Sequence, residues 1–255
     1  INSSTLDPIG GIVLKDSQGS PTGILKDGAM ALVNNVVPEY SIEEMDQALD
    51  AAMEFALSLG ITQIHDMGTW KSLETYKRNY KNGRLKIRIK IYPWYTNWEK
   101  IIRNVQKNGP GDEWLRWDGI KGMMDGSLGS RTAWMHKPYL PDLFSSEKEE
   151  LPTVGIITLK DTTEFKHILR ETDKANIQHA VHAIGDRAND WILDEFAAIK
   201  AEFGQKDRRC RIEHAQHLSK SAVPRFAAEN IIPSMQPYHI FDDGSWAHKR
   251  IEHDR

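Results

Sequence analysis

The amino-acid sequence predicts an α/β protein built on a parallel sheet, and three observations lead to that prediction. Six short apolar segments with strand character alternate with amphipathic segments of helical periodicity. Most of them recur about 20 to 35 residues apart, the spacing of β–α units joined by right-handed crossovers. Polar side chains stand at the carboxyl end of nearly every strand, which is where α/β proteins bind ligands.

Two architectures fit this alternation, an open doubly wound sheet and a closed (β/α)8 barrel. No glycine-rich phosphate-binding loop of the dinucleotide or Walker type follows any strand, which disfavours the doubly wound alternative. The polar strand ends favour a TIM (β/α)8 barrel. Six strands are two short of a closed barrel, so either the strand count is wrong or the barrel is incomplete.

The N-terminal residues 1–40 are rich in turn formers and contain two short strand-like segments, Ile12–Lys15 and Gly23–Leu25. The turn between them predicts a small hairpin that packs on the rim of the domain. Residues 41–255 are then the barrel core.

The first helix is expected from Ser41 to Leu59. Ser41 is a good N-cap, and Glu44 follows at the spacing of a capping box. Apolar residues recur at helical intervals up to Gly60, a residue typical of the end of a helix. A short strand at 61–66 completes the first helix–strand unit.

The same unit recurs to the end of the chain. Further helices are expected at 70–80, 97–107, 162–175, 188–203 and 219–229, and further strands at 86–92, 118–125, 177–183, 209–215 and 231–236. The long interval before the strand at 177–183 is the irregular one, because loops of that length are usually functional or disordered. Its first half predicts an ordered pocket loop, and Ser145–Glu150 an exposed tip.

The composition is that of a globular protein without a polyanionic partner. The chain has 255 residues, 40% of them hydrophobic and 27% charged, with a formal net charge of −3. This charge gives no electrostatic reason to bind nucleic acid or an anionic membrane. There is no apolar run of about 18 residues, and the single cysteine, Cys210, excludes an internal disulfide and favours a reducing, cytoplasmic location.

Two histidines, His182 and His214, occupy equivalent positions at the ends of adjacent predicted strands. Neighbouring parallel strand ends bring such side chains together, and two imidazoles suit zinc, iron or another divalent ion. The alternative is a pair of core histidines bonded to backbone, and spacing alone does not decide between them. His179 precedes His182 by three residues, faces the other side and is expected to be structural.

Three charged residues near these strands also have two interpretations each. Lys121 lies in a predicted buried strand, so it is either paired with Asp125 or Asp66 or chemically active as a nucleophile, Schiff-base former or carbamate. Asp186 is an N-cap or orients a metal ligand. Arg131 either holds a substrate carboxylate or pairs with a surface acid.

Five blocks of sequence together resemble the metal-dependent amidohydrolase superfamily. They are GITQIHDMG, IKGMMDGSLGSRTAWMHKPY, HAVHAIGDRANDWILDEF, RCRIEHAQHL and IIPSMQPYHIFDD. The segments HAIGDRA and DGSLGSRTA are the most specific. The similarity is to the third amidohydrolase family, which includes N-substituted formamide deformylase and the exoenzyme regulatory proteins.

The resemblance implies a (β/α)8 barrel with one or two divalent metal ions, zinc above all. Lys121 would be the strand-four lysine, carboxylated and bridging, with His182 and His214 as the strand-five and strand-six ligands. A metal-bound hydroxide would then attack the C–N bond of a small amide, formamide or cyclic amide. Arg131, Gln236 and His239 would contact the substrate.

The chain departs from this family pattern at both ends. The family's His-x-His pair does not occur, and the chain stops at Arg255, before the strand that supplies the last aspartate ligand. The sequence therefore predicts strands two to seven of a barrel, from a longer protein, without the flanking β-sandwich. Such a fragment should be inactive alone, bind metal weakly and form homo-oligomers through open sheet edges. A non-catalytic regulatory or binding protein on the same scaffold is the alternative.

Overall fold

A computed structural model describes residues 1–141 and 154–252, so the expected tip at Ser145–Glu150 lies outside the described residues. The chain divides into two compact units. The first unit comprises residues 1–37, 123–166 and 181–255, and the second comprises 38–122 and 167–180. Three elements cross the division and are shared by the two units: strand β6 (Gly119–Met123), helix α5 (Thr162–Lys174) and strand β7 (Gln178–Ala183).

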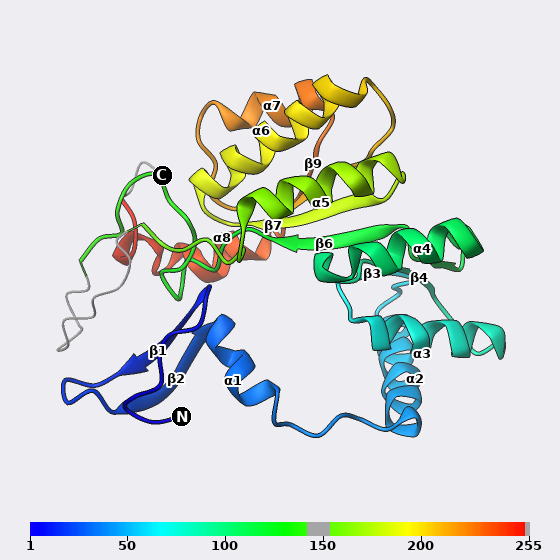
Figure 1. Ribbon diagram of the computed structural model, residues 1–255, viewed down its shortest axis with the longest axis horizontal. Coiled ribbons are helices and arrows are strands. Elements are labelled where there is room, and N and C mark those ends of the chain that lie inside the picture. Colours follow the sequence, from blue (N-terminus) through cyan, green and yellow to red (C-terminus); the bar gives the residue numbers. More distant parts are fainter. Residues whose placement is uncertain (142–153, 253–255) are drawn as a thin grey trace. The chain divides into compact units, whose positions relative to one another are not determined.

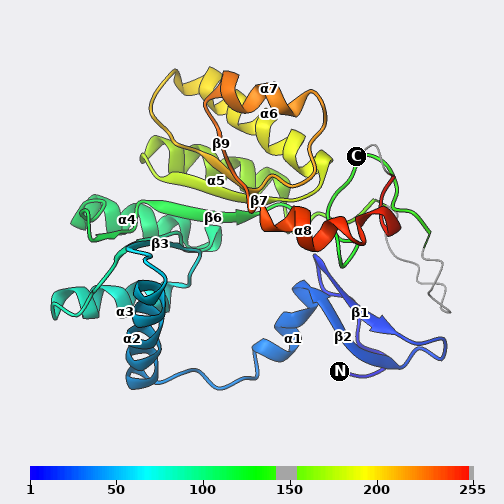
Figure 2. The ribbon, with the colours of Figure 1, turned by 180° about the vertical axis from the view of Figure 1, so that it is seen from behind.

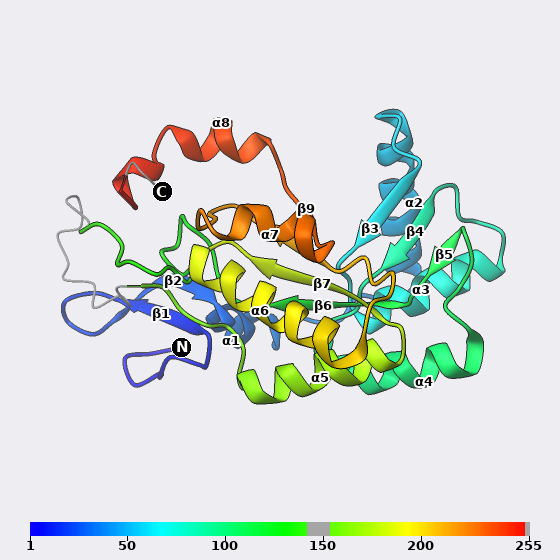
Figure 3. The same cartoon turned by 90° about the horizontal axis from the view of Figure 1, so that it is seen from above.

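The second unit contains alternating helices and parallel strands. Its other elements are α2 (Ile42–Ser58), β3 (Gln63–Asp66), α3 (Trp70–Lys81), β4 (Arg88–Ile91), the 3-10 helix η2 (Tyr95–Asn97), α4 (Trp98–Asn108) and β5 (Leu115–Arg116). Strands β3, β4 and β5 form a three-stranded parallel sheet in that order, which Figure 3 shows. An isolated parallel bridge joins Trp94, just after β4, to Lys121 in β6.

The expected capping box of α2 is present. The Ser41 hydroxyl accepts from the Glu44 backbone N–H at 3.1 Å, and the Glu44 carboxylate accepts from the Ser41 N–H at 2.7 Å. The helix buries Leu49 and Met53 in a cluster that also contains Ile89. Each such side chain contributes about 1.5 to 3 kcal/mol when fully buried, so cap and core together determine where α2 lies along the sequence.

The first unit begins with an antiparallel hairpin. Its strands are β1 (Gly11–Lys15) and β2 (Pro21–Asp27), in which Val13 pairs with Leu25, and η1 (Gly28–Met30) and α1 (Ala31–Asn34) follow. Figure 1 shows this hairpin in blue near the N-terminus. The hairpin expected from the turn formers is confirmed, and both of its strands are longer than predicted.

The rest of the first unit again alternates helices and strands. Its elements are α6 (Asp186–Phe203), β8 (Arg211–His214), α7 (Ala222–Glu229), β9 (Ile232–Ser234), α8 (Tyr238–Gly244) and η3 (Ala247–Lys249). Helices α6 and α7 lie side by side, as Figures 1 and 2 both show. A separate apolar cluster contains Leu128, Met135, Tyr139, Ile184 and Ile251.

The observed sheets confirm the α/β class and all six expected parallel-sheet segments. The order of the larger sheet is β6-β7-β8-β9, so consecutive strands of the chain are neighbours, and β8 and β9 are parallel. Among the described residues, the sheets of two, three and four strands do not close into a barrel. Sequential parallel order is what a (β/α)8 barrel requires, and closure stays a prediction.

Some elements were not expected from the sequence. Strand β5 has two residues, α1 has four, and α8 has no fully buried residue, so none of them carries an apolar periodicity that predicts it. Helix α6 begins at Asp186, two residues earlier than its apolar pattern indicates. No helix in the described part of the chain is long and apolar enough to cross a membrane.

Candidate functional site

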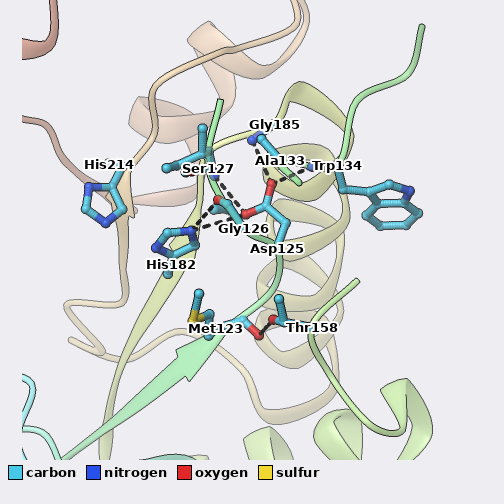
Figure 4. Close-up of polar contacts among 12 residues, drawn as sticks. Met123, Asp125, Gly126, Ser127, Ala133, Trp134, Thr158, His182, Gly185 and His214 are labelled. Carbon is cyan, nitrogen blue, oxygen red and sulfur yellow. Dashed lines mark hydrogen bonds and ion pairs between the residues drawn. The ribbon is translucent and has the colours of Figure 1, made fainter. Parts of the chain in front are cut away.

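The two histidines at the ends of β7 and β8 lie against each other in the first unit. The ring centroids of His182 and His214 are 4.7 Å apart, with an angle of 73° between the rings (Figure 4). The chain turns sharply after β8, because His214 has φ 74° and Ala215 has φ 42°. Such left-handed backbone is uncommon outside glycine and is concentrated at functional sites.

Hydrogen bonds orient both imidazoles. The His182 Nε2 atom lies 2.9 Å from the Gly126 carbonyl oxygen, and the His214 Nδ1 atom lies 2.8 Å from the Gln236 Oε1 atom. A carbonyl oxygen only accepts, so in the neutral rings these nitrogens carry the proton. The unprotonated nitrogens are then Nδ1 of His182 and Nε2 of His214, the form in which imidazole binds a metal ion.

Two further residues that were singled out for substrate contact lie beside this pair. Gln236 follows β9, and its side chain holds His214 as described. His239 lies in α8, and its ring is stacked on that of His214 at a centroid distance of 5.9 Å and an angle of 28°. The structure therefore brings four predicted residues together: His182, His214, Gln236 and His239.

Asp125 joins this group, although the sequence marks it only as a polar strand end and as a possible partner for Lys121. Its carboxylate is fully buried and accepts backbone hydrogen bonds from Ile184 at 3.0 Å and from Gly185 and Trp134 at 2.8 Å. Its Oδ1 atom lies 3.4 Å from His182 Nε2. Burial raises the pKa of Asp125 to about 7, and Asp27 adds to this effect, while the three N–H donors oppose it.

The loop after Asp125 presses closely on the turn between β7 and α6. A Cβ atom on Gly185 would lie 2.1 Å from the Trp134 carbonyl oxygen, and one on Gly126 would lie 1.9 Å from the Thr132 hydroxyl oxygen. Real Cβ atoms do not approach other atoms so closely, so both positions need glycine. This contact explains why Asp125 can reach amides of the loop and of the turn at once.

Arg131 lies inside that loop. It is 8% exposed, its backbone has φ 58°, and its Nη1 atom donates to the Leu140 carbonyl oxygen at 2.6 Å. The Tyr139 hydroxyl donates to the Ala133 carbonyl oxygen at 2.9 Å in the same loop. Arg131 thus helps to hold the loop together, and its contact with substrate stays a prediction.

Lys121 belongs to the second unit. It is buried in β6, 6% exposed, and its backbone N–H donates to the Pro93 carbonyl oxygen at 2.9 Å. In the same unit the Tyr76 hydroxyl donates to Asp66 at 2.8 Å, and burial raises the pKa of that carboxyl. The burial expected for Lys121 is confirmed, while its carboxylation stays a prediction.

Two other expectations can be compared with the structure. His179 is fully buried with its Nε2 atom 2.8 Å from the Thr172 hydroxyl, which confirms a structural histidine. The expectation that Asp186 caps α6 is wrong, because Gly185 is the N-cap and makes no side-chain cap. Asp186 instead accepts a hydrogen bond from the His136 backbone N–H at 2.8 Å, and this contact with a distant loop displaces it from the capping role.

The chemistry of this site fits a divalent ion in part. Among the described residues, no group of three or more His, Cys, Asp or Glu side chains is arranged to hold one. His182 and His214 alone offer two imidazole nitrogens at a strand-end position, and imidazole suits zinc. The pair can therefore supply two ligands of a metal centre.

Comparison with known proteins agrees with this picture. A model of the amidohydrolase family matches residues 1–255. The protein LONG AFTER FAR-RED 3 of Arabidopsis thaliana is 35% identical over 265 residues, which cover 99% of this chain and 44% of that protein. The N-substituted formamide deformylase of Arthrobacter pascens is 24% identical over 231 residues, which cover 84% of this chain and 40% of that protein.

A solved structure shows the same fold. The crystal structure of an uncharacterized metal-dependent hydrolase from Pyrococcus furiosus superposes with a TM-score of 0.71 at 24% identity. The match covers 95% of this chain and 49% of that one. The chain thus spans about half the length of the relatives that it matches.

Proposed function

Because the chain belongs to the amidohydrolase family, we propose that it forms the (β/α) barrel core of a metal-dependent hydrolase. The bond cleaved would be the C–N bond of a small amide, formamide or cyclic amide. The observation that supports this proposal most is the His182–His214 pair at adjacent strand ends, with ring centroids 4.7 Å apart. Residues 41–255 are the proposed core, and residues 1–40 are the proposed rim segment.

The proposed site assigns a role to each residue. His182 and His214 hold a divalent ion, zinc in the first instance, and Lys121 is a further, carboxylated ligand. Gln236 fixes the ring of His214 through the 2.8 Å hydrogen bond to its Nδ1 atom. Arg131, Gln236 and His239 contact the substrate. A bound divalent ion supplies a Lewis acid that activates water and polarises the carbonyl of an amide.

The alternative is a binding or regulatory protein on the same scaffold. It is favoured by one observation, that the described residues offer no group of three or more ligating side chains. Two imidazoles alone bind zinc more weakly than the three or four ligands of catalytic and structural sites. Metal binding and hydrolysis must therefore be measured separately.

The test of the metal site is a zinc titration of the ¹⁵N-histidine-labelled chain followed by NMR. We expect the ring signals of His182 and His214 to shift together, and the shift of His214 in His182→Ala to require a much higher zinc concentration. His248→Ala removes an exposed histidine in η3 and serves as the matched control, which should leave both signals responsive. If the ring signals of His182 and His214 did not shift at millimolar zinc, the proposal would be contradicted.

The test of the reaction is release of amine from a panel of formamides and cyclic amides with added zinc. Because the sequence lacks the family's His-x-His pair, we expect only very slow, zinc-dependent release from this chain alone, and we expect that release to be lost in both His182→Ala and His214→Ala. A chain that binds zinc at this pair and hydrolyses none of the panel would favour the binding protein instead.

A further inference from the structure

Asp125 connects three separate parts of the first unit through one carboxylate. It accepts from the Trp134 N–H in the loop after β6 and from the Ile184 and Gly185 N–H groups after β7. Its Oδ1 atom also lies 3.4 Å from His182 Nε2, a contact that is dashed in Figure 4. A fully buried carboxylate with this many donors holds its neighbours in one arrangement, because each lost contact would leave a buried polar group unsatisfied.

The surroundings of His182 Nε2 select one tautomer of its ring. The Gly126 carbonyl oxygen lies 2.9 Å away, and the Asp125 carboxylate lies just beyond on the same nitrogen. Both are acceptors, and Gly126 follows Asp125 directly in the chain, so fixing one fixes the other. A proton on Nε2 is therefore favoured, and the unprotonated nitrogen that binds metal is Nδ1.

An amide cannot replace this carboxylate without conflict. The Ile184 N–H faces Oδ1, and the Gly185 and Trp134 N–H groups face Oδ2. In an asparagine, one of the two positions becomes an NH₂ group that meets an N–H donor.

We propose that Asp125 is the positioning residue of the site, holding His182 in the Nε2–H tautomer, in which Nδ1 would be the nitrogen that binds a metal ion, and tying the loop after β6 to that ring. This inference rests on the proposed metal-binding function of His182. Asp125 itself acts through His182 and through the Gly126 carbonyl.

The direct test is the tautomer of His182 in the unaltered chain, read at pH 8 without metal from the ¹⁵N and ¹H couplings of its ring. We expect the proton on Nε2. A proton on Nδ1 would overturn the inference, and this measurement needs no variant that has to fold.

The second test compares zinc affinity in Asp125→Asn and in Tyr139→Phe. Tyr139→Phe removes the hydrogen bond to Ala133 and loosens the same loop without touching His182, so it serves as the structural control. We expect Asp125→Asn to weaken zinc binding by about 10- to 100-fold, the usual effect of losing a residue that orients a metal ligand. Tyr139→Phe should leave the affinity unchanged, and equal losses in both variants would show a merely structural role.

A double-variant cycle separates this inference from the proposed function. In His182→Ala, the further change Asp125→Asn should have no additional effect on zinc affinity, because the residue it positions is gone. If Asp125→Asn weakened zinc binding as much in His182→Ala as in the unaltered chain, Asp125 would not act through His182. A chain that never binds zinc would refute the proposed function, while the tautomer of His182 would still test the role of Asp125.

Discussion

Two buried aspartates flank strand β6, and the protein stabilises them in opposite ways. Asp118, before the strand, pairs with Lys90 at 3.0 Å and with Arg116. Burial raises the pKa of Asp118, but the hydrogen bonds and charges of these cations outweigh it and lower the pKa overall. Asp125, after the strand, faces backbone N–H groups and His182, and burial raises its pKa to about 7.

The difference separates a stabilising end of the strand from the end that carries the proposed site. In β–α folds, residues at the amino ends of strands serve stability, and those at the carboxyl ends serve function. A carboxylate that is paired with cations stays ionised, and its role is to stabilise the fold. A carboxylate held by N–H groups beside a histidine has a perturbed pKa, and such groups cluster at functional sites.

The largest effect is expected from removing the carboxylate at the stabilising end. Asp118→Ala leaves Lys90 mostly buried without that partner, so the free energy of unfolding should fall by about 4 kcal/mol. Urea denaturation measures this loss. Asp207→Ala breaks the exposed pair with Arg209 and should cost less than about 1 kcal/mol. Similar losses in the two variants would show that the Asp118 cluster is not stabilising.

The next effect concerns the donors of Asp125. In Gly185→Ala, the added methyl group overlaps the Trp134 backbone, so the loop and the turn must separate. We expect a loss of about 3 kcal/mol in the free energy of unfolding. Gly129→Ala, where the nearest atom to the new Cβ lies 3.5 Å away, is the control and should be nearly neutral. Equal stability of both variants would rule out the close contact.

The dependence of stability on pH should have opposite signs for the two carboxyls. The pKa of Asp125 lies above that of an unfolded aspartate, so the folded chain binds the extra proton and loses stability as pH rises. Between pH 5 and pH 7 this loss is about 2 kcal/mol. Stabilisation by Asp118, whose pKa is lowered, is instead present above about pH 4 and lost in acid.

Denaturation of the metal-free chain and of Asp125→Asn across this pH range measures the contribution of Asp125. The difference in unfolding free energy between the two proteins should change by about 2 kcal/mol from pH 5 to pH 7. Parallel curves would show that Asp125 does not titrate in this window.

The smallest expected loss of stability comes from Arg116→Ala, and it shows which of the two cations stabilises the Asp118 carboxylate. The Arg116 side chain is 43% exposed, whereas that of Lys90 is 13% exposed. Arg116→Ala leaves the Lys90 pair intact, so it should cost less than about 1 kcal/mol of unfolding free energy. A loss as large as that of Asp118→Ala would assign the stabilisation to Arg116 instead.

The sequence predicts the parts of this molecule that depend on local patterns. The bounds of α2 follow from the Ser41–Glu44 capping box and from its apolar spacing. The approach of His182 and His214 follows from their equivalent positions on neighbouring strands of one sheet. In each case, neighbouring residues or a regular repeat carry the information.

The parts that sequence reasoning missed depend on contacts between distant residues. The partners of Asp125 are backbone amides up to 60 positions away in the chain, and no side-chain pattern marks a backbone donor. Asp186 does not cap α6, and its carboxylate instead accepts a hydrogen bond from the His136 N–H, 50 positions away in the chain. Two weak signals were available in the sequence: Asp125 stands at the carboxyl end of a predicted strand, and Gly126 follows it directly.

The comparison of the two aspartates is tested most directly by the zinc affinity of Asp125→Asn and Asp118→Asn, measured side by side by NMR titration. We expect a loss of about 10- to 100-fold in Asp125→Asn and an unchanged affinity in Asp118→Asn. Equal affinities in the two variants, or a loss confined to Asp118→Asn, would contradict the assignment of function to the Asp125 end of the strand.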